Sequence, residues 1–178
     1  GSRLLDLQYQ SHAVTPGKPP IEGLPATYTE QDGEADTLTV TLADPLAGVT
    51  VTLFYTVFAQ LPAIARHAEI ACTGENPVSL DRAMSLCLDL PDSDYEMVEL
   101  TGAWARERHV ATRPLAEGVQ AVYSLRGHSS HQFNPFLALK RPDCGEMHGE
   151  VYGFSLVYSG NFLAQADVDP YHVTRVTM

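Results

Sequence analysis

The sequence predicts an all-β protein, an antiparallel β-sandwich, on three observations. Apolar and polar residues alternate along several short segments, which is the period of a strand with one face buried. Gly, Pro and Asp separate these segments at short intervals and supply turns. No segment carries the period of about 3.6 residues that marks a long amphipathic helix. Many short strands between frequent turns are typical of a sandwich or a barrel.

The clearest strand is the segment 49–58, where apolar residues occupy every second position from Val49 to Val57. The preceding run, Leu38-Thr-Val-Thr-Leu42, alternates in the same way. Between them, Asp44-Pro-Leu-Ala-Gly48 has the Pro and Gly of a turn. The two segments therefore predict a β-hairpin.

Further strands follow along the chain by the same pattern. Segment 64–72 alternates, the turn Gly74-Glu-Asn-Pro77 ends it, and segment 81–90 resumes the alternation. The remaining predicted strands are Met97–Leu100, Gln120–Leu125, Phe136–Lys140, Glu150–Tyr158, Asn161–Val168 and Val173–Met178.

Composition and charge exclude several classes of protein. A length of 178 residues fits one domain or a truncated one, and 44% hydrophobic with 19% charged residues is ordinary for a globular chain. The apolar segment 49–58 is interrupted by threonines and followed by Gln60 and Pro62, so we expect no membrane span. A net charge of -11 with only 11 Lys and Arg residues argues against a nucleic-acid partner.

The three cysteines, Cys72, Cys87 and Cys144, lack CxxC spacing. Cys72 and Cys87 fall in alternating segments, so we expect small buried thiols in a reducing compartment and a cytoplasmic protein. Gly1-Ser2 is typical of a cloning remnant, and the last predicted strand runs up to Met178. These ends lead us to expect a piece of a longer protein.

Trp104 is the only tryptophan and the first candidate binding residue. Its neighbours Arg106, Glu107 and Arg108 are charged, and an exposed indole in such a setting can stack on the C–H face of a sugar. A buried indole in the core is the alternative that composition alone favours. The two arginines either orient the ring through ion pairs or shield a strand edge.

His128 and His131 have the spacing H-x-x-H, with Cys144 and His148 downstream. A zinc site is one interpretation. On a strand, two residues three apart point to opposite faces, so we expect loop histidines and no metal. The same loop, Ser129–Pro135, is rich in neutral hydrogen-bonding groups that suit either sugar hydroxyls or bonds within the loop.

No catalytic group is predicted within the chain. The acidic run from Asp89 to Glu99 lacks the glycine and final glutamate of an EF-hand loop, and a glycosidase acid pair normally comes from separate elements. We expect a solvated acidic turn there. Nucleophile-elbow, P-loop and dinucleotide-binding motifs are absent from the sequence.

Three stretches together resemble a known family. They are Gly102-Ala-Trp-Ala-Arg-Glu-Arg108, Arg126-Gly-His-Ser-Ser-His-Gln-Phe-Asn-Pro-Phe136 and Gly149-Glu-Val-Tyr-Gly-Phe-Ser-Leu-Val-Tyr-Ser-Gly-Asn-Phe-Leu-Ala-Gln165. Read together, they are similar to the N-terminal β-domain of bacterial α-galactosidases of glycoside hydrolase family 36. The resemblance implies a super-sandwich type of fold and a retaining enzyme that removes terminal α-linked galactose from melibiose, raffinose and related sugars. Its catalytic aspartates would lie on a separate (β/α)8 barrel and need no metal or other cofactor.

For this chain, the resemblance implies an accessory domain over residues 3–178 that lacks its first strands and the barrel. Such a fragment would be inactive alone, would join the missing barrel and would form a homo-oligomer in the full-length enzyme. Trp104 would bind the galactose-containing oligosaccharide, with Arg106, His131 and Asn134 as weaker candidates. Two other functions stay open: a stand-alone carbohydrate-binding or cupin-like sandwich, and an oligomerisation domain in which Trp104 is buried.

Overall fold

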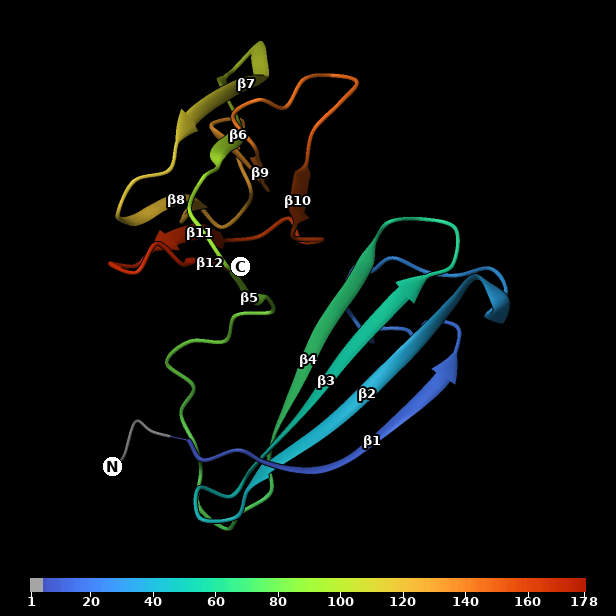
Figure 1. Cartoon of the computed structure of the whole chain (residues 1–178). Helices are drawn as coiled ribbons and strands as arrows, with labels where there is room; N and C mark the ends of the chain where they lie inside the picture. Colours follow the sequence, from blue (N-terminus) through green and yellow to red (C-terminus); the bar gives the residue numbers. More distant parts are fainter. Residues whose placement is uncertain (1–4) are drawn as a thin grey trace. The chain divides into compact units, whose positions relative to one another are not determined.

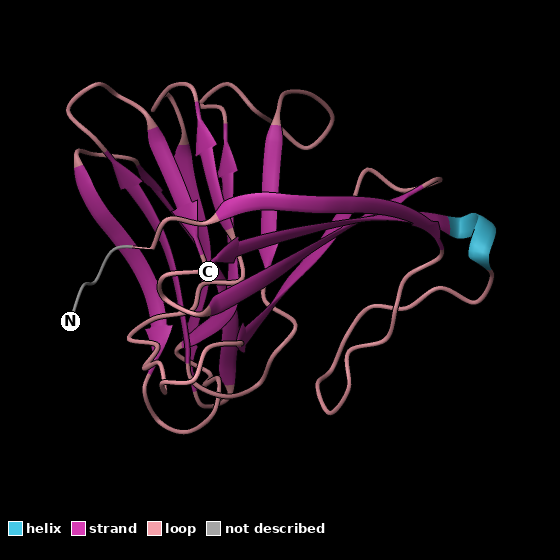
Figure 2. Ribbon diagram, turned by 90° about the horizontal axis from the view of Figure 1, so that it is seen from below, coloured by secondary structure: helices cyan, strands magenta, loops and turns pink. Residues whose placement is uncertain are grey.

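The computed structural model describes residues 5–178. Strands dominate this part of the chain, and its one helical segment is the short 3-10 turn Asp32–Glu34 (Figure 2). The prediction of a cloning remnant at Gly1-Ser2 lies outside the described residues. The chain divides after Ser85 into two compact units, the second being Leu86–Met178. The all-β prediction is confirmed.

The first unit is one antiparallel sheet with the order β1-β2-β3-β4 (Figure 1). Its strands are β1 (Gln8–Pro16), β2 (Ala35–Asp44), β3 (Val49–Phe58) and β4 (Ile64–Cys72). The predicted β2–β3 hairpin is confirmed, with Asp44 paired to Val49. The Asp44 carboxylate accepts the N–H of Ala47 at 2.8 Å and of Asp6 at 2.9 Å. These backbone donors lower the pKa of Asp44 and stabilise the turn.

The two faces of this sheet differ in chemistry. One face carries the buried hydroxyl pair of Thr37 and Thr56, 2.8 Å apart, and a stacked pair of rings, Phe54 and His67, with centroids 4.2 Å apart. Partial burial lowers the pKa of His67. The opposite face is apolar, and much of it is exposed to solvent. Its exposed residues include Tyr9, Val14, Leu38, Val57, Ile64 and Ile70.

The second unit is a sandwich of two antiparallel sheets, β10-β9-β6-β7 and β5-β12-β11-β8. The first sheet contains β6 (Glu96–Ala103), β7 (Arg106–Pro114), β9 (Phe133–Lys140) and β10 (Val151–Ser155). The second contains β5 (Cys87–Leu90), β8 (Gly118–Ser124), β11 (Phe162–Val168) and β12 (Thr174–Thr177). Side chains from both sheets form one core, chief among them Met97, Leu137, Leu139, Val122, Phe162, Ala164 and Val176. Burial of these apolar groups supplies most of the unit's stability.

The structure differs from the sequence-based expectations in three respects. Of the strand predicted over residues 81–90, only Cys87–Leu90 forms a strand, β5, which pairs with β12. Strands β1 and β7 were not predicted, because both are exposed strands at a sheet edge and lack the apolar alternation of a half-buried strand. Cys72 and Cys87 are exposed rather than buried, and Cys144 is half-buried.

No helix within residues 5–178 is long and apolar enough to cross a membrane.

Candidate functional site

Trp104 lies at the tip of the hairpin between β6 and β7, and 83% of its surface is exposed. Ala103 pairs with Arg106, so only Trp104 and Ala105 form the turn. This exposure contradicts the interpretation of Trp104 as a core residue. An indole held at the end of a two-residue turn presents a large apolar surface to a ligand or a partner.

Two neighbours hold the hairpin in shape. The Glu107 carboxylate accepts the N–H of Ala105 at 2.8 Å, and Ala105 has a left-handed backbone with φ of 62°. Gly102 lies at a bulge between β6 and β7, where an added Cβ would be 2.4 Å from the carbonyl oxygen of Arg106. Only glycine fits that close approach. The direction in which Trp104 leaves the sheet therefore depends on Gly102 and Glu107.

The ion pairs considered for Arg106 and Arg108 do not form within the described part of the chain. Instead, the charged neighbour that orders the turn is Glu107, through a bond to the backbone. Arg108 has a φ of 60° and is exposed. It lies on β7, an edge strand, so the other role expected for it, shielding of that edge, stays a prediction.

The loop 125–132 lies beside the base of this hairpin. The N–H of Gly102 donates to the carbonyl oxygen of Gln132 at 3.2 Å. The loop also bonds to itself, since the Ser124 hydroxyl donates to the carbonyl oxygen of His128 at 2.6 Å and the Ser130 hydroxyl accepts the N–H of Gln132 at 3.1 Å. These bonds match the alternative in which the loop satisfies its own polar groups.

The same loop is bonded to the turn before β11. The N–H of Ser129 donates to the carbonyl oxygen of Ser159 at 2.7 Å, and the Asn161 side chain accepts the N–H of Gly127 at 2.7 Å. The three distinctive stretches of the sequence thus lie together in the second unit. His131 is exposed and Asn134 is half-buried on β9, and neither side chain bonds to another described residue.

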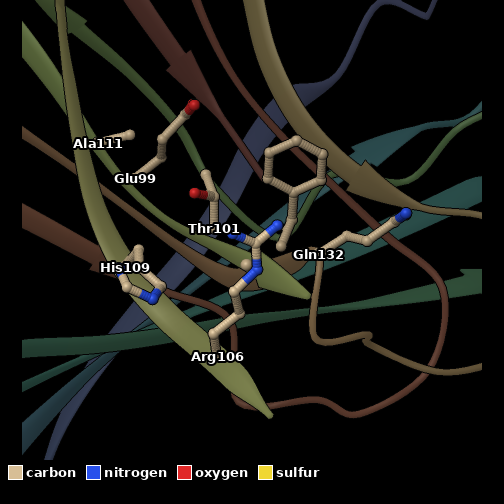
Figure 3. A pocket seen from close by; sticks show the side chains of 8 residues that line it. Glu99, Thr101, Arg106, His109, Ala111 and Gln132 are labelled. Carbon is tan, nitrogen blue, oxygen red and sulfur yellow. The ribbon is translucent and has the colours of Figure 1, made fainter. Parts of the chain in front are cut away.

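An open hollow lies on the sheet next to the hairpin (Figure 3). Its lining residues are Glu99, Thr101, Gly102, Arg106, His109, Ala111, Gln132 and Phe133. Arg106 is the one predicted site residue among them. Gln132 belongs to the loop Ser129–Pro135, which was considered for sugar hydroxyls. Thr101 and His109 were missed, because no motif marks them and only the register brings Thr101 opposite both His109 and Phe133. A smaller neighbouring hollow shares Gln132 and Phe133 and reaches Arg126.

The histidines considered as metal ligands do not converge. The Nδ1 atom of His128 lies 2.9 Å from the carbonyl oxygen of Ser129, and the Nε2 atom of His148 lies 2.9 Å from that of Asp143. Among residues 5–178, no group of three His, Cys, Asp or Glu side chains is close enough to hold a metal ion. Both rings instead bond within their own loops.

The acidic run is more ordered than the solvated turn that we expected. Four of its carboxylates form ion pairs across strands, namely Asp89 with Arg175, Asp92 with Arg141, Glu96 with Lys140 and Glu99 with Arg113. Arg141 also lies over the ring of Tyr95, 4.0 Å from its centroid. The guanidinium lowers the pKa of Asp92 and the carboxylate raises that of Arg141, while burial raises the pKa of Tyr95. Three of these pairs join neighbouring strands of one sheet, and the Asp92–Arg141 pair joins the residues that flank β6 and β9.

Comparison with known proteins identifies the family of the chain. The model of the glycosyl hydrolase family 36 N-terminal domain matches residues 1–178. The α-galactosidase AgaA of Geobacillus stearothermophilus is 50% identical over 178 residues, which are 100% of this chain and 24% of AgaA. The α-galactosidase Mel36A of Lactobacillus acidophilus is 41% identical over 96% of this chain and 23% of its own length.

Solved structures agree with this assignment. The crystal structure of AgaA superposes with a TM-score of 0.98 at 50% identity, over 100% of this chain and 25% of that chain. Variants of AgaA were solved with raffinose and with stachyose. The chain spans about a quarter of the length of these relatives. It belongs to glycosyl hydrolase family 36, as an N-terminal domain of that family.

Proposed function

We propose that this chain is part of a longer cytoplasmic α-galactosidase, in which it binds sugar and contributes to assembly. The whole protein would release terminal α-linked galactose from oligosaccharides such as melibiose and raffinose. The observation that carries the proposal is the exposed Trp104 hairpin in a chain that matches family 36 from end to end. The relatives' complexes with raffinose and stachyose support the same class of substrate.

Trp104 is the main sugar contact in this proposal. Its ring offers an apolar face to the C–H groups of galactose, and its N–H can donate to a hydroxyl. Arg106 lines the adjoining hollow, while His131 and Asn134 belong to the neighbouring segment and carry side chains without partners among the described residues. These three residues would add hydrogen bonds to sugar hydroxyls.

The reacting carboxylates would come from a barrel outside this chain. A retaining glycosidase needs two carboxyl groups about 5 Å apart on either side of the bond that breaks. Here, four acidic residues of the run are instead paired with cations that neutralise them. We therefore expect the 178 residues alone to be inactive. Neither a metal nor another cofactor enters the proposed reaction.

Assembly is the second role of the domain. The apolar face of the β1–β4 sheet exposes side chains such as Val14, Val57 and Ile64, each more than half exposed. Monomeric proteins rarely leave apolar surface of this kind uncovered. We expect additional strands of the longer protein, its barrel or further copies to cover it. The isolated chain should then self-associate, and a single monomeric species in sedimentation at high concentration would argue against this.

The test is substitution of Trp104 in the longer protein. Trp104→Ala should lower kcat/KM for melibiose by about 10- to 100-fold, since it removes a stacking contact of about 1–3 kcal/mol. Trp104→Phe should retain most of the activity, because a phenyl ring still stacks. Equal activity of the Ala variant and the wild type would rule out the proposed role.

A second candidate function is a stand-alone carbohydrate-binding sandwich. It is favoured by the polar hollow that lies beside Trp104 in the second unit. In that case, the isolated chain should bind melibiose by itself. Calorimetric titration of the isolated chain with melibiose separates the two functions. If the barrel is needed to complete the sugar site, then the isolated chain should not bind melibiose.

A further inference from the structure

The inner face of the β10-β9-β6-β7 sheet changes from apolar to polar along β6. Met97 is fully buried in the core and pairs with Leu139. Toward the hairpin, alternate positions on the same face are occupied by Glu99 and then Thr101, which line the hollow. The interior of a sandwich is normally apolar along its whole length. This end of the face is therefore built for water or for a polar ligand.

Four polar side chains around this hollow lack partners. Thr101, Arg106, His109 and Gln132 make no side-chain hydrogen bond or ion pair with another described residue. Figure 3 shows the Arg106 guanidinium directed into the hollow between Thr101 and Gln132. Glu99, which also lines the hollow, is the exception, because its carboxylate forms an ion pair with Arg113 at 2.9 Å. The hollow is thus lined by a hydroxyl, a guanidinium, an imidazole and an amide that form no hydrogen bond within the described chain.

Such a set of groups suits a neutral sugar. Sugar hydroxyls both donate and accept, which matches hydroxyl, amide and imidazole groups, and the Phe133 ring adds an apolar surface to the same hollow. An anion is less well suited, because the Glu99 carboxylate lines the hollow and the chain carries a net charge of -11. The mixture of a few convergent polar groups with apolar surface is that of a small-ligand site.

We propose that this hollow binds the sugar unit to which the terminal galactose is linked. The inference rests on the proposed function, in which the adjacent Trp104 contacts that galactose. The residues that carry it are Thr101 and His109, which face each other across β6 and β7, with Arg106 and Gln132 at the sides. They would set the preference for an oligosaccharide over a galactoside with a different leaving group.

The test compares two substrates in the longer protein. Raffinose carries a sugar next to its galactose, whereas p-nitrophenyl α-galactoside carries an aromatic ring. Thr101→Val and His109→Ala should each raise KM for raffinose about tenfold, the effect of one lost hydrogen bond, and leave KM for the aryl galactoside unchanged. Thr101→Ser keeps a hydroxyl and should restore raffinose binding.

Thr112→Val is the matched control. Thr112 lies on the same strand as His109, is exposed and pairs with Val98 on the opposite face of the sheet. This variant makes the same chemical change as Thr101→Val outside the hollow, so its KM for raffinose should match the wild type. Circular dichroism establishes that each variant is folded, and His109→Gln replaces His109→Ala if the latter unfolds.

Three results would overturn the proposal. An unchanged raffinose KM in Thr101→Val and His109→Ala would exclude a sugar contact, although Trp104→Ala could still impair both substrates and leave the proposed function intact. Equal losses for both substrates would assign the residues to galactose binding or to folding. Competitive inhibition of the wild type by inorganic phosphate, lost in Arg106→Gln, would identify an anion site. A wild-type protein without α-galactosidase activity would remove the proposed function itself.

Discussion

The two ends of β6 use polar residues in opposite ways. At its start, Glu96 pairs with Lys140, and nearby Asp92 pairs with Arg141, which also covers Tyr95. At its other end, Thr101 and the hairpin residues Arg106 and His109 present side chains without partners in the described chain. Polar residues that bond to one another hold a fold together, whereas unpaired ones beside an exposed indole are available for a ligand. The contrast separates the structural end of the strand from the end that we propose to bind sugar.

The largest effect expected at the proposed binding end is that of Gly102→Ala. The new methyl group would meet the carbonyl oxygen of Arg106 at 2.4 Å, so the hairpin must move. We expect a loss of about 2–3 kcal/mol in the free energy of unfolding and a change in Trp104 fluorescence. Denaturant titration measures the first and the emission spectrum the second. Gly33→Ala, where no atom lies within 4 Å of the added Cβ, should change neither.

At the structural end, the Asp92–Arg141 pair predicts a dependence of stability on pH. The pKa of Asp92 is lower in the folded chain than its ordinary value of about 3.9, so the unfolded chain binds the proton more tightly. The stabilisation is complete above about pH 5 and is lost as the pH falls through the folded-state pKa. Thermal unfolding between pH 7 and pH 3 should show the loss.

Asp92→Asn provides the comparison for that measurement. It should lower the melting temperature at pH 7 and leave a weaker dependence on acid pH than the wild type has. The direction follows from removal of the bidentate partner of Arg141. Identical acid profiles for the two proteins would show that the pair contributes nothing measurable, as many exposed ion pairs do.

The smallest effect is expected from Glu107 at the hairpin tip. Glu107→Ala removes the acceptor of the Ala105 N–H and should cost about 0.5 kcal/mol, because the bond is exposed. It should also lower the fluorescence anisotropy of Trp104, the only tryptophan. Glu107→Gln keeps an acceptor oxygen and should restore the anisotropy. If both variants behave alike, then Glu107 does not hold the turn.

Strands with a clear alternation could be predicted from the sequence. β3 and β4 begin and end at the predicted residues because their apolar positions alternate throughout. β7 was missed because the segment from Arg106 to Pro114 is charged and exposed along an edge. Only Cys87–Leu90 of the segment from Asp81 to Leu90 forms a strand, because pairing with β12 is a tertiary property that the local pattern does not contain.

The candidate site was predicted only in part, for a related reason. Trp104 stands out because it is the single indole among charged neighbours. Thr101 and His109 are ordinary residues that become neighbours only through strand register, and a backbone bond to Gly102 brings Gln132 of the predicted loop beside them. The acidic run was likewise predicted to be a solvated turn, because its basic partners lie elsewhere in the chain. Arg141 is 49 residues from Asp92, and Arg175 is 86 residues from Asp89.

The exposed thiols have a practical consequence for measuring the two units. Cys72 ends β4 in the first unit, Cys87 begins β5 in the second, and both are exposed, whereas Cys144 is half-buried. Maleimide dyes or nitroxide labels should attach to the first two sites before the third, with Cys144→Ser removing the slow one. A donor and an acceptor on these positions would report the distance between the units and its change on sugar addition. Cys72 and Cys87 therefore serve as native labelling sites for this distance measurement.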